Sequence, residues 1–310
     1  IKKSIKNKRN KVISNFSLFL IFPIIVAMVF WWDKNIKRSE YYAAVGYKWE
    51  VPFGVGELSA EQMKKKQFRY HFIYQGGLLA KYLGYGNKVI ELRHENSLGY
   101  MSELNSLAEQ KDARIQYYYK ENGEIDTAST YSLTDMLLNK KSYEFSKNRV
   151  TVTFLNKNNN SASFNGPPQN HESVFFKRSN VTRIKKYFNT QGYVEKEIYQ
   201  KDSFGGIGND EFGRSGYSYS YNKYGLVNEL TDISTDKLHL EKNKKRIITK
   251  YNYNSMGLID TIEFNNNSSI SSKNNNEVAK KSYIYDSYGN ILKTLHFNEN
   301  NTLSNNKNGV

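Results

Sequence analysis

The hydrophobic and polar positions of this chain alternate over many short segments with a period of two, which is typical of β-strands. Such segments start at residues 68, 115, 143 and 173, and the pattern is clearest in "GYSYSY", residues 216–221. Alternate residues of a strand point to opposite faces, so the tyrosines of this stretch share one face. The pattern predicts a mostly β chain.

Three short helices are expected between the strands. "SAEQMKKKQ" starts at Ser59 and has Gln62 three residues later, the spacing of a capping box. Residues 104–113 and 132–141 are two further candidates, the second with Ser132 and Asp135 at capping distance.

The N-terminal part has a different pattern. Residues 1–11 carry six positive charges and no acid, and residues 12–32 carry no charge. A helix of that length spans roughly 30 Å, the thickness of a bilayer's hydrocarbon core, and Trp31 and Trp32 fall where an interfacial aromatic belt is expected. The pattern predicts an uncleaved transmembrane signal anchor at 12–32. A cleavable signal peptide is the alternative, disfavoured because no small-residue cleavage site follows closely.

The basic tail at 1–11 sets the expected orientation, because positive flanks stay in the cytoplasm. We expect a single-pass protein of the bacterial inner membrane, with a cytoplasmic N-terminus and a periplasmic or extracellular C-terminal domain. Membrane lipid is then one partner, through the anchor. The expected organisation continues with a juxtamembrane segment at 33–66, a divergent β region with short helices at 67–179, repeats at 180–297 and a disordered Asn-rich tail at 298–310.

A repeated unit dominates the second half of the chain. "YSYNKYGLV", "YNYNSMGLI" and "YIYDSYGNI" share the form Tyr-x-Tyr-Asn/Asp-x-x-Gly-x-Ile/Val, and their glycines Gly225, Gly257 and Gly289 are 32 residues apart. "KYFNTQGYV" is an earlier copy with Asn189 and Gly192, and "YYYKENGEI" is a further one with Lys120 in place of Asn or Asp. Periodicity of this size indicates a repeat architecture.

The chemistry of the unit is that of a β-turn. Asn or Asp at the first turn position accepts hydrogen bonds from nearby backbone amides, and Gly at the fourth adopts the left-handed conformation. We therefore expect bulged hairpins whose tyrosines stack as cross-strand aromatic pairs. The predicted turn residues are Asn189, Gly192, Asn222, Gly225, Asn254, Gly257, Asp286 and Gly289, and the predicted aromatic face is Tyr219, Tyr221, Tyr251, Tyr253, Tyr283 and Tyr285.

The unit "YDSYGNI" resembles the YD repeat of RHS-repeat proteins, whose signature is a Tyr-Asp pair, a following Gly and an aliphatic residue. Tyr285-Asp286 is a literal match, and Tyr221-Asn222 and Tyr253-Asn254 are near matches. The resemblance covers residues 180–300 well and 67–155 faintly. It implies antiparallel hairpins in a curved, open sheet, a partial shell of the kind that encloses a toxin in bacterial polymorphic toxins. This chain has too few units to close a shell, and its 32-residue period is longer than the usual unit.

Candidate catalytic chemistry is sparse. The chain has no cysteine, its five histidines are scattered, and it has no GxSxG or HExxH motif. "GGIGNDEFGRSG" does not have the spacing of a phosphate loop, and Asp202, Asp210 and Glu211 around it miss the spacing of a calcium loop. The sequence thus predicts no catalytic residue, no metal site and no cofactor.

We expect a non-enzymatic, membrane-anchored envelope protein whose repeat sheet is a binding module. The partner is expected to be a protein or a polysaccharide, not a nucleic acid, and the oligomeric state is left open. A role in a contact-dependent or polymorphic toxin system rests on the family resemblance alone. The alternatives are a polysaccharide-binding or polysaccharide-degrading envelope protein and an orphan repeat remnant.

Overall fold

The chain was studied in a computed structural model, which describes residues 21–83, 87–102, 113–156, 158–162, 181–209, 214–233, 247–266, 269–270 and 278–304. Within these ranges it is mostly β, as the alternating pattern predicts. It divides into two compact units: Ile1–Ser39 with Ile73–Ile90, and Glu40–Phe72 with Glu91–Val310.

The first unit contains the helical residues 21–35 and the short helix α3, Leu78–Leu83. The carboxylate of Asp33 accepts hydrogen bonds from the backbone amides of Leu79 (3.2 Å) and Ala80 (2.8 Å). These amides belong to the first turn of α3, where helix N–H groups have no partner within the helix, so Asp33 caps α3 from outside.

The predicted transmembrane anchor is wrong. No helix in the described ranges has both the length and the apolar character needed to cross a membrane. Trp31 and Trp32, predicted at a membrane interface, are exposed on the described helix at 21–35. The predicted inner-membrane localisation depended on the anchor and is corrected with it. The tail 1–11 and residues 12–20 of the predicted span lie outside the described residues.

The strands follow one another along the chain with few interruptions. Their bounds are β1 Lys37–Lys48, β2 Val51–Glu57, β3 Phe68–Gln75, β4 Lys88–Asn96, β5 Arg114–Tyr119, β6 Ile125–Tyr131, β7 Leu137–Ser146, β8 Arg149–Leu155, β9 Arg183–Phe188, β10 Val194–Gln200, β11 Gly216–Tyr221, β12 Val227–Ile233, β13 Ile247–Tyr253, β14 Ile259–Asn266, β15 Ser269–Ile270, β16 Lys280–Tyr285 and β17 Ile291–Phe297. Helix α2, Ala60–Lys65, lies between β2 and β3.

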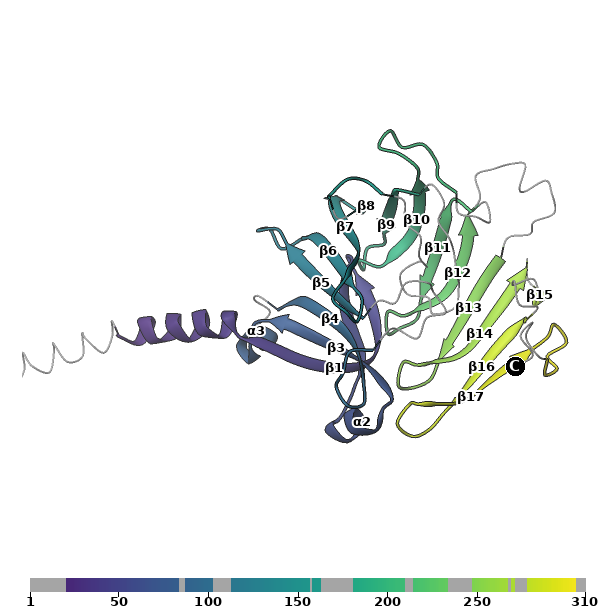
Figure 1. The fold of residues 1–310 in the computed structure, drawn as a ribbon, viewed down its shortest axis with the longest axis horizontal. Coiled ribbons are helices and arrows are strands. Elements are labelled where there is room, and N and C mark those ends of the chain that lie inside the picture. Colours follow the sequence, from purple (N-terminus) through teal and green to yellow (C-terminus); the bar gives the residue numbers. More distant parts are fainter. Residues whose placement is uncertain are drawn as a thin grey trace, which may run out of the picture. The chain divides into compact units, whose positions relative to one another are not determined.

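From β4 onward the second unit is an antiparallel meander in which each strand pairs with the next (Figure 1). The short β15 pairs with one end of β14, and β16 pairs with β14 directly before β17 completes the series. β1 pairs with β2 in antiparallel register and also pairs with β3, so these strands belong to the same sheet. Such sequential pairing is the ordinary outcome of linked hairpins.

The expected capping box of α2 is confirmed. The amide of Gln62 donates to Ser59 Oγ (3.2 Å), and the amide of Ser59 donates to Gln62 Oε1 (2.9 Å). The helix expected at 132–141 is wrong. Ser132 Oγ accepts from the amides of Thr134 and Met136, Asp135 has φ 58°, and β7 begins at Leu137, so the segment forms a hairpin turn instead. The candidate at 104–113 lies almost wholly outside the described residues.

The core of the second unit is rich in large rings. The largest fully buried side chains include Tyr199, Tyr217, Tyr251 and Phe72, together with Ile125, Leu230 and Ile262. Burying a ring of this size removes more apolar area from water than any aliphatic side chain does. This use accounts for the six buried tyrosines of the described residues, Tyr74, Tyr117, Tyr143, Tyr199, Tyr217 and Tyr251, without a chemical role.

Candidate functional site

The hairpins within residues 180–297 end in one recurring turn. In each, the glycine amide donates to the carbonyl of the first turn residue at 3.0–3.1 Å, and that residue's Oδ1 accepts from two further backbone amides. The glycines have φ between 76° and 87°. The pairs of first residue and glycine are Asn189 and Gly192, Asn222 and Gly225, Asn254 and Gly257, and Asp286 and Gly289.

The same turn also occurs at three places where the fourth position is not a glycine. Ser132, Asn156 and Asn298 each hold two later amides on their side-chain oxygen, and a residue other than glycine takes the positive φ in each case: Asp135, Asn159 and Asn301. Asn and Asp tolerate the left-handed region better than other residues with a side chain.

One segment, Trp49–Gln67, lies along the turns of the repeat hairpins, and we call it the turn-crossing segment. A Cβ added to each turn glycine would overlap a neighbouring side chain, and in each case that segment supplies one of the neighbours. The pairs, in chain order, are Gly192 with Trp49, Gly225 with Phe53, Gly257 with Val55, and Gly289 with Lys66. The repeat glycines thus have a second role, since their lack of a side chain leaves room for this segment.

Polar contacts attach both ends of the turn-crossing segment. At its start the amide of Trp49 donates to the carbonyl of Gly192 (2.7 Å), and both carboxylate oxygens of Glu50 lie 2.9 Å from the Lys186 ammonium. Glu50 and Lys186 are both buried, so this ion pair is shielded from solvent.

At the other end of the segment, the buried Lys66 donates to the carbonyl of Gly289 (2.9 Å). Lys65 donates to the hydroxyl of Tyr288 (2.6 Å), and its carbonyl accepts from the Asn290 amide group (3.0 Å). The segment therefore holds the first and the last of these turns by specific bonds and the two middle turns by packing.

The second tyrosine of three units bonds to the preceding hairpin. The hydroxyls of Tyr221, Tyr253 and Tyr285 donate to the backbone carbonyls of Val194, Val227 and Ile259 at 2.8, 2.6 and 2.6 Å. Burial raises the pKa of the Tyr221 hydroxyl, which keeps it protonated as a donor. Each of these tyrosines links one hairpin to the one before it.

The first tyrosine of each repeat unit does not form the expected aromatic pair with the residue opposite it on the neighbouring strand. The direct cross-strand partners are not aromatic: Leu230 opposite Tyr219, Ile262 opposite Tyr251 and Thr294 opposite Tyr283. In two units the first ring stacks on the second along the same strand, with centroids 6.5 Å apart for Tyr219 and Tyr221 and 6.4 Å for Tyr283 and Tyr285. Between hairpins, Tyr221 stacks on Tyr193 with centroids 4.9 Å apart.

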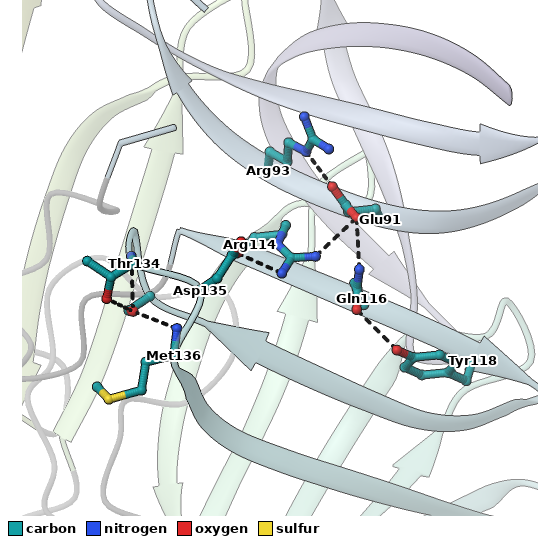
Figure 2. Close-up of polar contacts among 9 residues, drawn as sticks. Glu91, Arg93, Arg114, Gln116, Tyr118, Thr134, Asp135 and Met136 are labelled. Atoms are coloured by element: carbon teal, nitrogen blue, oxygen red, sulfur yellow. Dashed lines mark hydrogen bonds and ion pairs between the residues drawn. The ribbon is translucent and has the colours of Figure 1, made fainter. Parts of the chain in front are cut away.

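A polar and aromatic surface lies on one face of β4–β6, and we call it the Arg–Tyr patch. Its members are Glu91 and Arg93 on β4, Arg114, Gln116 and Tyr118 on β5, Tyr131 on β6, and Asp135 and Met136 in the following turn. The register places Glu91 opposite Gln116 and Arg93 opposite Arg114, so the β4 and β5 side chains share a face. Figure 2 shows their network of contacts.

Arg114 is the centre of the patch (Figure 2). Its guanidinium lies 3.4 Å from Glu91 Oε2 and 2.8 Å from Asp135 Oδ1. Arg114 Cζ also lies over the Tyr131 ring, 4.3 Å from the ring centre. Gln116 donates to Glu91 (3.1 Å) and accepts from the Tyr118 hydroxyl (3.0 Å). Glu91, Asp135 and Tyr131 together hold the Arg114 guanidinium in place.

The electrostatics of Glu91 follow from the same contacts. Burial raises the pKa of Glu91, but hydrogen bonds from Arg93 and Gln116 and the charge of Arg114 outweigh it and leave the pKa below its ordinary value. Glu91 is therefore ionised at neutral pH. A general acid needs the opposite shift, so this carboxylate is suited to a fixed hydrogen-bond acceptor.

Sequence reasoning missed the Arg–Tyr patch because no local motif joins its residues. They come from three strands and a turn that meet only in the sheet. The available signal was the period-two spacing of Glu91 with Arg93 and of Arg114, Gln116 and Tyr118.

A second ionic cluster is buried. His71 Nδ1 bonds to Glu95, Arg69 lies 3.6 Å from the same carboxylate, and the Tyr41 ring stacks on His71 with centroids 4.4 Å apart. His94 packs on Phe68 instead, so the two adjacent strands keep these histidines in different surroundings.

Metal binding has no support within the described part of the chain, where no group of three or more His, Asp or Glu side chains could hold an ion. Asp202 Oδ1 accepts from the amides of Phe204 and Gly206 in a turn of the repeat type. Asp210 and Glu211 lie outside the described residues.

Comparisons with known proteins assign no family. No family model and no curated protein matches the chain. Among solved structures, a porin-like protein from Bacteroides uniformis matches at 12% identity over 62% of this chain and 85% of that chain, with a TM-score of 0.26. A complex of TcdB2, TccC3 and Cdc42 matches at 9% identity over 74% of this chain and 12% of that chain, with a TM-score of 0.22. Scores this low carry no argument, and the likeness to YD repeats remains a resemblance in the sequence.

Proposed function

We propose that this chain is a non-enzymatic binding module that contacts a protein partner through the Arg–Tyr patch, while the linked hairpins serve as its scaffold. The composition of the patch supports the proposal. Arg, Tyr and Met are the residue types enriched where proteins meet, and they are frequent among the few side chains that carry most of the binding energy.

The observation that carries the proposal is the fixed guanidinium of Arg114 beside exposed anchors. Tyr118 is 49% exposed and Met136 61%, although each is large and apolar enough to be buried. Arg114 is held by Glu91, Asp135 and Tyr131, so little side-chain freedom remains to be lost on binding.

The charges of the patch favour a partner whose surface carries both positive and negative charges. Arg93 and Arg114 face Glu91 and Asp135, so neither sign dominates. A nucleic acid requires a basic surface, which this balance does not supply. The lowered pKa of Glu91 agrees with a positioning role, because the ionised carboxylate holds the donors of Arg114 and Gln116 in place.

The resemblance to RHS repeats suggests the class of protein to which the partner belongs. A component of a contact-dependent or polymorphic toxin system is the partner that this resemblance implies, and that assignment rests on the sequence unit alone. A polysaccharide is the competing ligand, since an exposed tyrosine beside a planar amide, such as Tyr118 beside Gln116, also suits sugars.

The test compares the full chain with two patch variants, Tyr118→Ala and Arg114→Ala, and with Tyr224→Ala as a matched control. Tyr224 has a similar exposure but lies in a repeat turn outside the patch. Proteins retained from an extract of the source cells are quantified for each variant, and the same chains are applied to a glycan array.

We expect one protein retained by the wild type and by Tyr224→Ala, with about tenfold weaker binding after Tyr118→Ala, the loss usual for an interface anchor. Equal retention by all variants would contradict the proposal. Glycan binding that depends on Tyr118 would replace the protein partner with a polysaccharide.

A further inference from the structure

The first unit carries an excess of positive charge that the second unit does not share. It comprises residues 1–39 and 73–90, which hold eleven Lys and Arg against one acid, Asp33. The second unit holds the other 34 of the chain's 45 cations and the other 29 of its 30 acids. Asp33 is buried and caps α3, so within the described part of the first unit no exposed acid offsets the cations.

The described helix of this unit is apolar and yet exposed. Trp31 is 69% exposed and Trp32 65%. The other exposed large apolar side chains of this helix are Ile21, Phe22, Ile24, Ile25, Met28, Val29 and Phe30. Soluble proteins rarely leave a contiguous apolar surface of this kind in water, and such a surface marks contact with another protein or with a membrane.

Helix α3 places a second group of apolar side chains next to the end of this helix. Leu78 is 63% exposed, Tyr82 79% and Leu83 60%. The carboxylate of Asp33, the residue after Trp32, accepts two amides from the first turn of α3, so the two helices are joined at this point (Figure 1). The two groups of side chains are therefore neighbours, and together we call them the exposed apolar surface.

Two lysines flank the exposed apolar surface. Lys34 and Lys37 are exposed and have no acidic partner among the described residues. Arg38, in contrast, is used within the fold, because its guanidinium donates to the carbonyl of Gly77 (2.7 Å). The ammonium groups of the two lysines thus remain accessible to an anion outside the chain.

Aromatic rings beside accessible lysines suit a bilayer surface better than a protein. Tryptophan and tyrosine prefer the headgroup level of a bilayer, where both the apolar ring and its polar edge find suitable surroundings. Lysine is depleted where proteins meet, whereas basic residues near a bilayer are attracted to anionic lipids. The excess of eleven cations over one acid therefore selects a bilayer that contains anionic lipids.

We propose that the first unit docks on the surface of an anionic lipid bilayer. The exposed apolar surface enters the boundary between headgroups and acyl chains, while Lys34 and Lys37 contact lipid phosphates. Binding of this kind needs no helix that crosses the bilayer, which agrees with the described helices. The residues involved are not those of the Arg–Tyr patch, so this proposal does not depend on the function proposed for the patch.

Vesicle co-sedimentation of the full chain tests the proposal. Vesicles of phosphatidylcholine alone are compared with vesicles that also contain phosphatidylglycerol. One variant carries Trp31→Ser with Trp32→Ser, and another carries Leu78→Ser with Leu83→Ser on α3. The matched control is Phe204→Ser, because Phe204 is 98% exposed but belongs to the second unit.

We expect the wild type and Phe204→Ser to bind the vesicles with phosphatidylglycerol more tightly than those without it. Each pair of serine substitutions should weaken binding by about 10- to 100-fold, because it removes two apolar side chains that lipid would cover. Lys34→Gln and Lys37→Gln should each weaken binding to the anionic vesicles by about fivefold and leave binding to the neutral ones unchanged. Lys223→Gln, at an exposed lysine of the second unit, should change neither.

Tryptophan fluorescence locates the surface within the bilayer. The third tryptophan, Trp49, lies in the second unit, so the signal lost on Trp31→Phe with Trp32→Phe comes from the helix. Lipids with bromine near the headgroup end of the acyl chains should quench this signal more than lipids with bromine at the chain ends. Stronger quenching from the chain ends would contradict docking at the surface.

The comparison of the two vesicle types uses the wild type alone, so it does not depend on the folding of a variant. Equal binding of the wild type to both vesicle types, or binding that survives the serine pair on α3, would overturn the proposal. Self-association that Trp31→Ser with Trp32→Ser abolishes, without vesicle binding, would overturn it in favour of a second copy as the occupant.

Discussion

Replacing Gly257 by alanine separates two reasons for a glycine in the repeat turn. Gly257 has φ 78°, and a Cβ there would lie 2.8 Å from Val55 Cγ1 in the turn-crossing segment. Gly99 is the matched control, because it has φ 84° in a turn of the same kind, and its added Cβ would meet only Arg69 Nη2 at an ordinary 3.5 Å.

The magnitudes follow from these two environments. Both substitutions place a Cβ in the left-handed region, which costs about 1–2 kcal/mol. Gly257→Ala also forces an overlap with Val55, and such overpacking costs a further ~1–3 kcal/mol. We therefore expect Gly257→Ala to lower the free energy of unfolding by about 2–5 kcal/mol, and Gly99→Ala by about 1–2 kcal/mol.

Urea unfolding of the full chain, followed by circular dichroism, measures both values. Val55→Ala in the Gly257→Ala background removes the overlapping methyl groups and should recover at least 1 kcal/mol or so of the loss, as a double-mutant cycle reports. If Gly257→Ala costs no more than Gly99→Ala, and Val55→Ala recovers nothing, then Val55 does not pack on this turn and the reasoning fails.

Three further predictions concern other contacts of the scaffold. Tyr253→Phe removes the hydroxyl that donates to Val227 and should cost about 0.5–1.5 kcal/mol in urea unfolding, whereas Tyr224→Phe on the surface should change stability by less than about 0.5 kcal/mol. Lys186→Met leaves the buried Glu50 without its ammonium partner and should lower the free energy of unfolding by about 3–5 kcal/mol. Adding Glu50→Leu should recover most of this loss, and no recovery would mean that the ion pair is not buried. Burial raises the pKa of Asp286, but hydrogen bonds from Asn290 and Tyr288 and the charge of Lys66 outweigh burial and leave the pKa below its ordinary value. The stabilising effect of the ionised Asp286 is therefore present above the ordinary Asp pKa and is lost as the pH falls through the lowered pKa. Asp286→Asn should therefore weaken the acid dependence of the melting temperature below about pH 4, and an unchanged dependence would contradict this assignment.

Local chemistry explains which parts of the fold could be predicted. The turn around Gly257 and the capping box of Ser59 depend on residues within four positions of each other, so the sequence carries their full signal. Ser132 misled the same reasoning, because Ser with an acid three residues later suits both a helix cap and a turn. The following strand, β7, decided the outcome through pairing with β6 and β8, which a local pattern does not contain.

Long-range contacts account for what the sequence did not reveal. The packing of Val55 on Gly257 joins residues about 200 positions apart, and the cluster around Arg114 joins three strands and a turn. A repeat predicts that hairpins stack, but it does not identify the segment that crosses their turns. The apolar run at 12–32 and its flanks gave a wrong prediction, because no helix in the described residues is long and apolar enough to cross a membrane.

The turn-crossing segment lies on the glycines of the repeat turns, and one disulfide tests this placement directly. A Cβ on Gly257 would lie 3.7 Å from Val55 Cβ, within the usual range for a disulfide, and the chain has no cysteine of its own. The pair Val55→Cys and Gly257→Cys should cross-link within one molecule under mild oxidation, as peptide mass spectrometry would show. The control pair Val55→Cys and Gly99→Cys should stay reduced, and equal cross-linking of the two pairs, or none in the first, would contradict the account.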